Sequence, residues 1–204
     1  MLRPPSHRYL VTKRMVDLAV CLVALAIAIP VLALLALAIV IDSPGPILFA
    51  QERTGRDGRR FRMLKLRTMV PDAEERKAEL WHLNVLPPPD FKIPNDPRIT
   101  RVGRFLRATS LDELPQLLNV LRGDMSLVGP RPTSFAPDTY ELWHTHRLDV
   151  APGITGLWQI EGRGVTTFDE RLRLDVQYIR RRSLLYDLQL LARTLPVVLR
   201  RSGR

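Results

Sequence analysis

The apolar and polar positions divide the chain into one long apolar segment and a longer region of short, mixed patterns. From Leu18 to Ile41 nearly every residue is apolar; Pro30 interrupts the run, and Asp17 and Asp42 bound it. Because an α-helix rises about 1.5 Å per residue, this run is long enough to cross a hydrocarbon core about 30 Å thick. Signal peptides have a shorter apolar core and a small-residue cleavage site, so the pattern predicts a retained membrane helix.

Basic residues flank this segment on both sides. The upstream residues are Arg3, Arg8, Lys13 and Arg14. The downstream residues are Arg53, Arg56, Arg59, Arg60, Arg62, Lys65 and Arg67. Positive charge marks the cytoplasmic side of a membrane segment, and a straight crossing would leave one flank outside. Pro30 bends a helix through its ring and its missing amide hydrogen. We therefore expect residues 1–46 to form a re-entrant helix kinked at Pro30, although a proline-bent spanning helix stays open.

The region from 47 to 204 shows short strand and helix patterns. Strands are expected over 47–51 and 60–69, joined by a loop containing Asp57-Gly58. Helices are expected over 71–83, from 110–112 to Gly123, and over 137–148, 168–182 and 183–199. The last has an apolar stripe suited either to a membrane interface or to the core. These patterns predict one compact, mainly α domain with a small β component (α+β), carrying interfacial amphipathic helices.

Charge and cysteine content limit the classes of function. The chain has 31 basic and 21 acidic residues, a net charge of +10, which suits a nucleic acid, an anionic lipid or a phosphorylated substrate. Its single cysteine, Cys21, excludes an internal disulfide and a cysteine-based zinc site.

Two adjacent carboxylates, Asp112 and Glu113, are the main candidates for chemistry. Alone, Ser110 to Glu113 has the form of a capping box, in which both acids would only stabilise a helix start. Arginine forks match phosphate oxygens, so a nucleophilic acid among arginines fits chemistry on a phosphate ester. The nearby arginines are Arg101, Arg104, Arg107, Arg122 and Arg131.

Two further stretches carry groups that suit phosphate or a nucleobase. Residues 60–69 alternate apolar and basic side chains, so Lys65 and Arg67 lie on a cationic strand face that could bind headgroups or phosphate. In the glycine-rich stretch 152–163, Trp158, Gln159 and Arg163 could contact a nucleobase or phosphate; a turn-rich strand pair is the alternative.

Several ordered blocks resemble the bacterial sugar transferases, also called monotopic phosphoglycosyl transferases or polyprenyl-phosphate sugar-1-phosphate transferases. The resemblance runs from Lys13 to the end of the chain. The blocks are Lys13-Arg14 with Asp17, Gln51 to Gly55, Phe61 with Lys65 to Met69, Ser110 to Leu117, Gly123 to Pro132, and Pro152 to Gly156 with Gln159 and Gly162-Arg163.

The resemblance implies a reaction and roles for residues. Such enzymes transfer a sugar 1-phosphate from a nucleotide diphosphate sugar, usually a UDP-sugar, to a polyprenyl phosphate and release UMP. Asp112 matches the nucleophile, which forms a covalent phospho-sugar intermediate and holds Mg²⁺, and Glu113 its partner. Arg107 and Arg131 match basic residues of the substrate site, to which we add Lys65, Arg67, Gln159 and Arg163. Ile29-Pro30 stands where the family has Ser-Pro.

The resemblance also implies a location and partners. It places the chain at the cytoplasmic face of the bacterial inner membrane, in glycoconjugate or exopolysaccharide assembly, with no nucleic-acid partner; a homodimer is allowed. The alternative from another class is a membrane-tethered basic module that binds anionic lipid or nucleic acid without catalysis. In that case the acids only cap helices.

Overall fold

The computed structural model describes residues 5–85, 91–135, 142–161 and 167–199. Within these residues the fold is mainly helical, with two small two-stranded sheets, which confirms the predicted mainly α fold. The helices are α1 (His7–Asp42), α2 (Arg101–Thr109), α3 (Gln116–Arg122), α4 (Leu157–Glu161), α5 (Phe168–Arg181) and α6 (Leu184–Leu199). The strands are β1 (Leu48–Thr54), β2 (Arg60–Leu66), β3 (Ser126–Val128) and β4 (Gly153–Thr155). Short 3₁₀ turns are η1 (Arg56–Gly58), η2 (Glu75–Lys77), η3 (Trp81–Leu83), η4 (Leu111–Glu113) and η6 (Leu142–Asp149).

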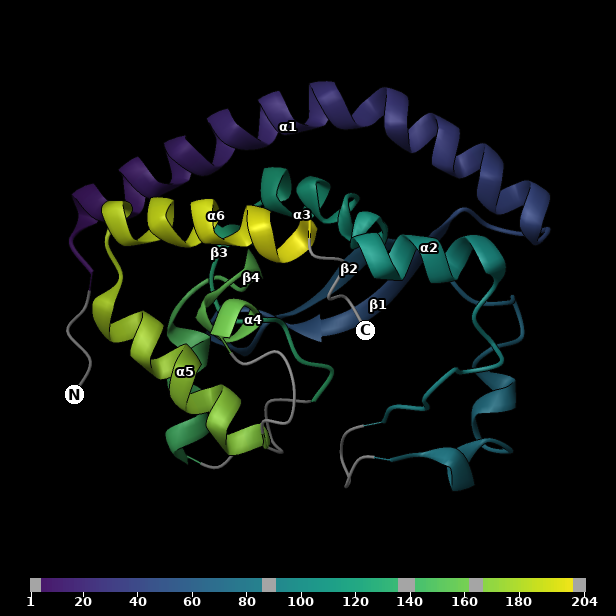
Figure 1. Cartoon of the computed structure of the whole chain (residues 1–204). Helices are drawn as coiled ribbons and strands as arrows, with labels where there is room; N and C mark the ends of the chain where they lie inside the picture. Colours follow the sequence, from purple (N-terminus) through teal and green to yellow (C-terminus); the bar gives the residue numbers. More distant parts are fainter. Residues whose placement is uncertain (1–4, 86–90, 136–141, 162–166, 200–204) are drawn as a thin grey trace.

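Helix α1 arches over the rest of the molecule (Figure 1). It is one continuous 36-residue helix that contains Pro30, and it bends without dividing into two helices. The re-entrant arrangement expected for residues 1–46 stays a prediction. Ala28 and Leu32, on either side of Pro30, pack against the same core and hold both halves in place. The opposite face is apolar and exposed, with Ile27 68% and Leu34 70% exposed. Among the described residues, α1 alone is long and apolar enough to cross a membrane.

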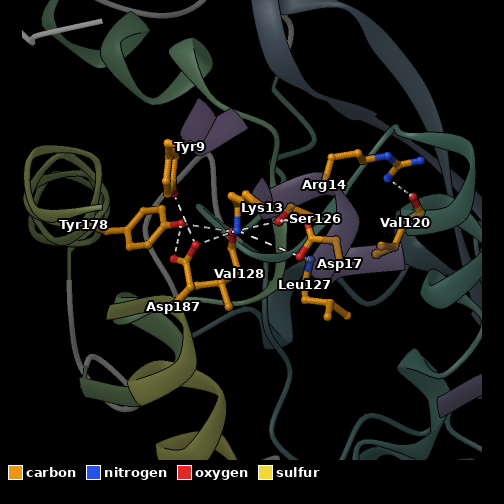
Figure 2. Close-up of polar contacts among 10 residues, drawn as sticks. All are labelled: Tyr9, Lys13, Arg14, Asp17, Val120, Ser126, Leu127, Val128, Tyr178 and Asp187. Atoms are coloured by element: carbon orange, nitrogen blue, oxygen red, sulfur yellow. Dashed lines mark hydrogen bonds and ion pairs between the residues drawn. The ribbon is translucent and has the colours of Figure 1, made fainter. Parts of the chain in front are cut away.

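Both ends of α1 are held by the same folded unit. Near its N-terminus, Lys13 forms an ion pair with Asp187 on α6 (Figure 2), with Nζ 2.9 Å from Oδ2. At its C-terminus, Asp42 Oδ2 accepts a 2.9 Å hydrogen bond from the Val102 amide at the start of α2. The predicted division at residue 46 stays a prediction, but Cys21 and Ala28 share one hydrophobic cluster with Met63, beyond that boundary.

The two sheets differ in how far sequence predicted them. Strands β1 and β2 form the expected antiparallel hairpin, with Leu48 opposite Leu66 and Thr54 opposite Arg60. Strands β3 and β4 pair in parallel, with Val128 opposite Thr155. The strand pair considered within 152–163 is therefore wrong, because β4 pairs with a distant segment and α4 follows it.

Asn119 fixes α3 against β2. Its side chain is fully buried; Oδ1 accepts from the Leu64 amide at 3.0 Å and Nδ2 donates to the Arg62 carbonyl at 2.8 Å. Buried amides are costly to leave unpaired, so these bonds fix the register between helix and strand. The side chain of Lys65, next on β2, takes its position from this register.

Two helix expectations need correction. Over 71–83 the chain forms turns and the short η2 and η3, because this polar segment has no apolar stripe to bury along a full helix. The helix predicted from 110–112 to 123 is divided into η4 and α3; its end is confirmed, with Gly123 in the left-handed conformation (φ 92°). The expected helix over 137–148 lies partly outside the described residues, and η6 occupies its later part.

Candidate active site

Asp112 and Glu113 lie in η4, between α2 and α3. The residue before this turn, Ser110, has φ 58°, and its backbone amide ends α2 by donating to Arg107. Its side chain makes no capping hydrogen bond, so Ser110 to Glu113 is not a capping box. The capping role considered for the two carboxylates is therefore not the one that this turn shows.

The Glu113 carboxylate joins three separate segments. Its Oε1 accepts from Lys65 Nζ on β2 at 2.7 Å and from Arg131 Nη2, three residues after β3, at 2.8 Å. Burial alone would raise the pKa of Glu113, but Arg131 and Lys65 outweigh it and hold the pKa well below its usual range. Glu113 is thus a fixed anion that holds two cations at this place.

Asp112 is buried, with 8% of the residue exposed, but is bound less tightly than Glu113. Its nearest cation is Lys65, with Nζ 3.8 Å from Oδ2, and no hydrogen bond reaches its carboxylate from the described part of the chain. Burial raises the pKa of Asp112; Lys65 opposes this increase and the charge of Glu113 adds to it. The pair therefore consists of one engaged carboxylate and one available, more basic carboxylate.

Arg107 reaches the site from α2. Its Nε donates to Thr68 Oγ1 at 2.8 Å. Burial lowers the pKa of Arg107, and the charges of Asp112 and then Asp96 oppose this change. Gly103 permits this arrangement, since a Cβ there would lie 2.0 Å from the Thr68 carbonyl oxygen. The close approach of α2 to Thr68 thus places Arg107 beside the Asp112–Glu113 pair, called the dyad below.

Arg131 is held by backbone on one side and by an ion pair on the other. After β3 the chain turns back toward the start of β4, where the Gly153 amide, opposite Ser126 in the register, donates to the Pro130 carbonyl at 2.8 Å. The Arg131 carbonyl accepts from Arg147, whose guanidinium also lies 2.8 Å from Asp175 Oδ2 on α5. The guanidinium of Arg131 lies 6.0 Å from the centre of the Trp158 ring.

The structure brings Asp112, Glu113, Lys65, Arg107 and Arg131 together, but not all the predicted site residues. Arg67 is buried and donates to Ser43 and Pro44 at the end of α1. Gln159 is buried on α4, where its amide donates to the Ile154 carbonyl at 3.3 Å. Arg163 lies outside the described residues. Substrate roles for these three stay predictions.

Sequence reasoning missed Thr68, Arg147 and Asp175. Asp175 had a usable signal: it lies on the buried face of α5 with Leu172 and Ile179, where an acid needs a buried cationic partner. Thr68 and Arg147 act through contacts with distant segments, which no local pattern indicates.

One groove in the described part of the chain lies away from this site. It has a volume of about 650 Å³ between η6 and α5, and its lining includes Trp143 and Arg173. None of the predicted site residues lines it, so the site is located by its charges and hydrogen bonds, not by this hollow.

The pattern of the whole chain decides its family. The model of the bacterial sugar transferases matches residues 8–201. The chain belongs to the bacterial sugar transferase family. The dyad, Lys65, Arg107 and Arg131 all fall inside the matched part.

Relatives in this family include three with informative names. The galactosyl transferase CpsE of Streptococcus agalactiae is 45% identical over 97% of this chain and 44% of the relative. The undecaprenyl-phosphate galactose phosphotransferase of Salmonella typhimurium is 43% identical over 97% of this chain and 42% of the relative. The UDP-glucose:undecaprenyl-phosphate glucose-1-phosphate transferase of Caulobacter vibrioides is 44% identical over 92% of this chain and 69% of the relative. The chain thus spans less than half the length of the first two.

The residues of this sugar transferase fit a magnesium ion shared with a substrate. Mg²⁺ is commonly held by one or two carboxylates plus substrate phosphates and water. Asp112 offers a carboxylate with no competing hydrogen bond from the described residues. Those residues contain no group of three or more histidine, cysteine or acidic side chains that could form an all-protein cage.

The Arg147–Asp175 pair behind Arg131 predicts a pH effect on stability. Burial raises the pKa of Asp175 to about 6, with Arg147 and Arg171 partly opposing it. The unfolded pKa is about 3.9, so the contribution of Asp175 to stability is fully present below that pH and is lost as the pH rises through about 6. We expect the unfolding free energy of the wild type, relative to Asp175→Asn, to fall by about 2 kcal/mol between pH 4 and 7.

Thermal or denaturant unfolding of both proteins in the same detergent, across this pH range, checks the prediction. A constant difference between the two proteins would contradict it.

Proposed function

We propose that this sugar transferase moves a sugar 1-phosphate from a UDP-sugar to a polyprenyl phosphate and releases UMP. Family membership and the names of the relatives support the class of reaction. The single observation that carries the proposal is the unequal state of the two carboxylates. Glu113 is engaged by Lys65 and Arg131, while Asp112, one residue earlier, has a raised pKa and no hydrogen bond from the described residues.

The first step is attack by Asp112 on the donor. A carboxylate oxygen of Asp112 forms a bond to the phosphorus that carries the sugar, and the bond from that phosphorus to the bridging oxygen of the diphosphate breaks. UMP leaves with the bonding electrons, and the sugar phosphate stays on Asp112 as an acyl phosphate. In the second step an oxygen of polyprenyl phosphate attacks the same phosphorus and the carboxylate leaves. The product is a polyprenyl diphosphate sugar.

The cations around the dyad make attack by one anion on another feasible. Lys65 and Arg131 are held in place by Glu113, and Arg107 by Thr68, so they are positioned before substrate arrives. Asp112 is the residue that would hold Mg²⁺, which when bound neutralises charge on the diphosphate. Glu113 remains ionised, since its pKa is depressed, and keeps the two cations from closing onto Asp112.

The membrane helix would bring this site to the lipid acceptor. Both ends of α1 contact the same unit, through Asp187 at one end and Val102 at the other, while the outer face exposes Ile27 and Leu34. We therefore propose a re-entrant helix that enters one leaflet from the cytoplasmic side and returns, with undecaprenyl phosphate as the acceptor. A homodimer and the absence of a nucleic-acid partner stay predictions.

The catalytic proposal predicts a strict requirement for the Asp112 charge. Purified wild type with UDP-sugars, Mg²⁺ and undecaprenyl phosphate should release UMP, and Asp112→Asn should lower the rate by at least about 1000-fold because the amide cannot attack phosphorus. Asp149→Asn, which removes an exposed aspartate of η6, should leave the rate within about twofold.

Two results would contradict the proposal: full UMP release by Asp112→Asn, or no release by the wild type with any UDP-sugar. The second, with lipid binding retained, would favour the non-catalytic basic module.

The topology is tested by single cysteines. In a Cys21→Ser background, His7→Cys and Arg56→Cys place a thiol at each end of the helix region. A membrane-impermeant maleimide should label neither in intact spheroplasts and both after lysis. Labelling of one position alone before lysis would establish a spanning helix and overturn the re-entrant arrangement.

A further inference from the structure

One face of the N-terminal half of α1 holds both segments that lead into the active site (Figure 2). Arg14 donates to the carbonyls of Val120 at 2.6 Å and Leu121 at 2.9 Å, near the end of α3. The Val120 carbonyl also accepts from the Gly123 amide at 3.1 Å, so the guanidinium adds to the backbone cap at the end of α3. Cys21, two turns further along α1, contacts the Leu117 carbonyl of the same helix at 3.1 Å.

Asp17, which lies between Arg14 and Cys21 on this face, holds β3. Its Oδ2 accepts from Ser126 Oγ at 2.7 Å and its Oδ1 from the Leu127 amide at 3.3 Å. Asp17 is 5% exposed, and its nearest cation, Lys13, lies closer to Asp187, at 2.9 Å against 3.9 Å. A buried carboxylate here would be expensive for simple anchoring, which an apolar residue of α1 could provide. Asp17 instead directs both of its oxygens at one strand.

The two segments held by α1 carry opposite partners of the Glu113–Arg131 contact. Glu113 lies just before α3, which Arg14 and Cys21 hold; Arg131 lies just after β3, which Asp17 holds. Between β3 and Arg131 the chain turns back toward the start of β4, with Gly129 N donating to Thr155 O at 2.9 Å and Gly153 N to Pro130 O at 2.8 Å. A displacement of β3 is passed on to Arg131 through these bonds. The two residues that meet in the 2.8 Å contact, Arg131 and Glu113, are thus each next to a segment that α1 holds.

We propose that Asp17 is a positioning residue of the active site, which acts through β3 to set Arg131 against Glu113 and so makes the membrane helix a working part of the catalytic scaffold. This rests on the proposed function, in which Arg131 stabilises charge on the substrate. Lys13, Arg14 and Asp17 form one of the blocks of family resemblance, and this assigns Asp17 a role in it.

The test is a double-variant cycle. Asp17→Asn keeps the size of the side chain but loses one of two acceptors, and should lower kcat for UMP release about tenfold with KM for the UDP-sugar within about twofold. In an Arg131→Lys background, the same substitution should have little further effect, because the residue through which Asp17 acts is already altered. Multiplication of the two losses, or an unchanged kcat in Asp17→Asn, would overturn the proposal.

A matched control separates positioning from helix anchoring. Tyr9→Phe removes a hydrogen bond from the same end of α1 to Asp187 on α6 and contacts neither β3 nor α3 through its hydroxyl. It should leave kcat within about twofold while lowering the unfolding temperature no less than Asp17→Asn does. A tenfold loss of kcat in Tyr9→Phe as well would reduce Asp17 to one anchor among others.

A readout without turnover keeps this test apart from that of the proposed function. With Trp81→Phe and Trp143→Phe, Trp158 is the only tryptophan, and its ring centre lies 6.0 Å from the Arg131 guanidinium and 5.7 Å from that of Arg171 on α5. Asp17→Asn should shift the emission of Trp158 or its quenching by acrylamide, and Tyr9→Phe should not. A shift without UMP release by the wild type would reject the proposed reaction alone; unchanged emission in Asp17→Asn would reject the positioning role.

Discussion

The bridge that Glu113 makes between Lys65 and Arg131 is the contact on which the site depends. It joins β2, the η4 turn and the segment after β3, three segments that are far apart in the sequence. Two cations held this close would repel each other without an anion between them, and the depressed pKa of Glu113 keeps that anion present. Since Glu113 satisfies the cations, Asp112 beside it stays available.

Helix α1 is part of the scaffold that supports this site. Its inner face contributes Cys21 and Ala28 to the main hydrophobic cluster and Asp17 to the support of β3, while its outer face is apolar and exposed. In the re-entrant arrangement that we propose, one helix would thus meet the lipid and also support the residues that act on a lipid phosphate. This sharing accounts for a helix that arches across the molecule, where a simple anchor would project away from it (Figure 1).

Sequence predicted the elements with clear periodicity and the residues with strong charge. The hairpin and the end of α3 followed from alternation and from Gly123. Lys65 followed from the cationic face of its strand, and Asp112, Glu113, Arg107 and Arg131 followed from the grouping of acids with arginines and from the family blocks. Arg67 was expected beside Lys65 because the two lie on one strand face, but β2 ends at Leu66 and the chain beyond it turns toward Ser43. Strands β3 and β4 have three residues each, too few to show a period, and their pairing joins distant segments. Helix α2 carried a readable apolar spacing at Val102, Phe105 and Leu106, and was overlooked.

The central claim is that Asp112 itself carries the sugar phosphate between donor and acceptor. Its most direct test is mass spectrometry of the purified protein after brief incubation with a UDP-sugar and Mg²⁺ in the absence of polyprenyl phosphate. The account predicts a mass increase of one sugar phosphate on the peptide that contains Asp112, which disappears when undecaprenyl phosphate is added. Lipid-dependent UMP release with no such adduct on that peptide, or with an adduct on Glu113 instead, would contradict it.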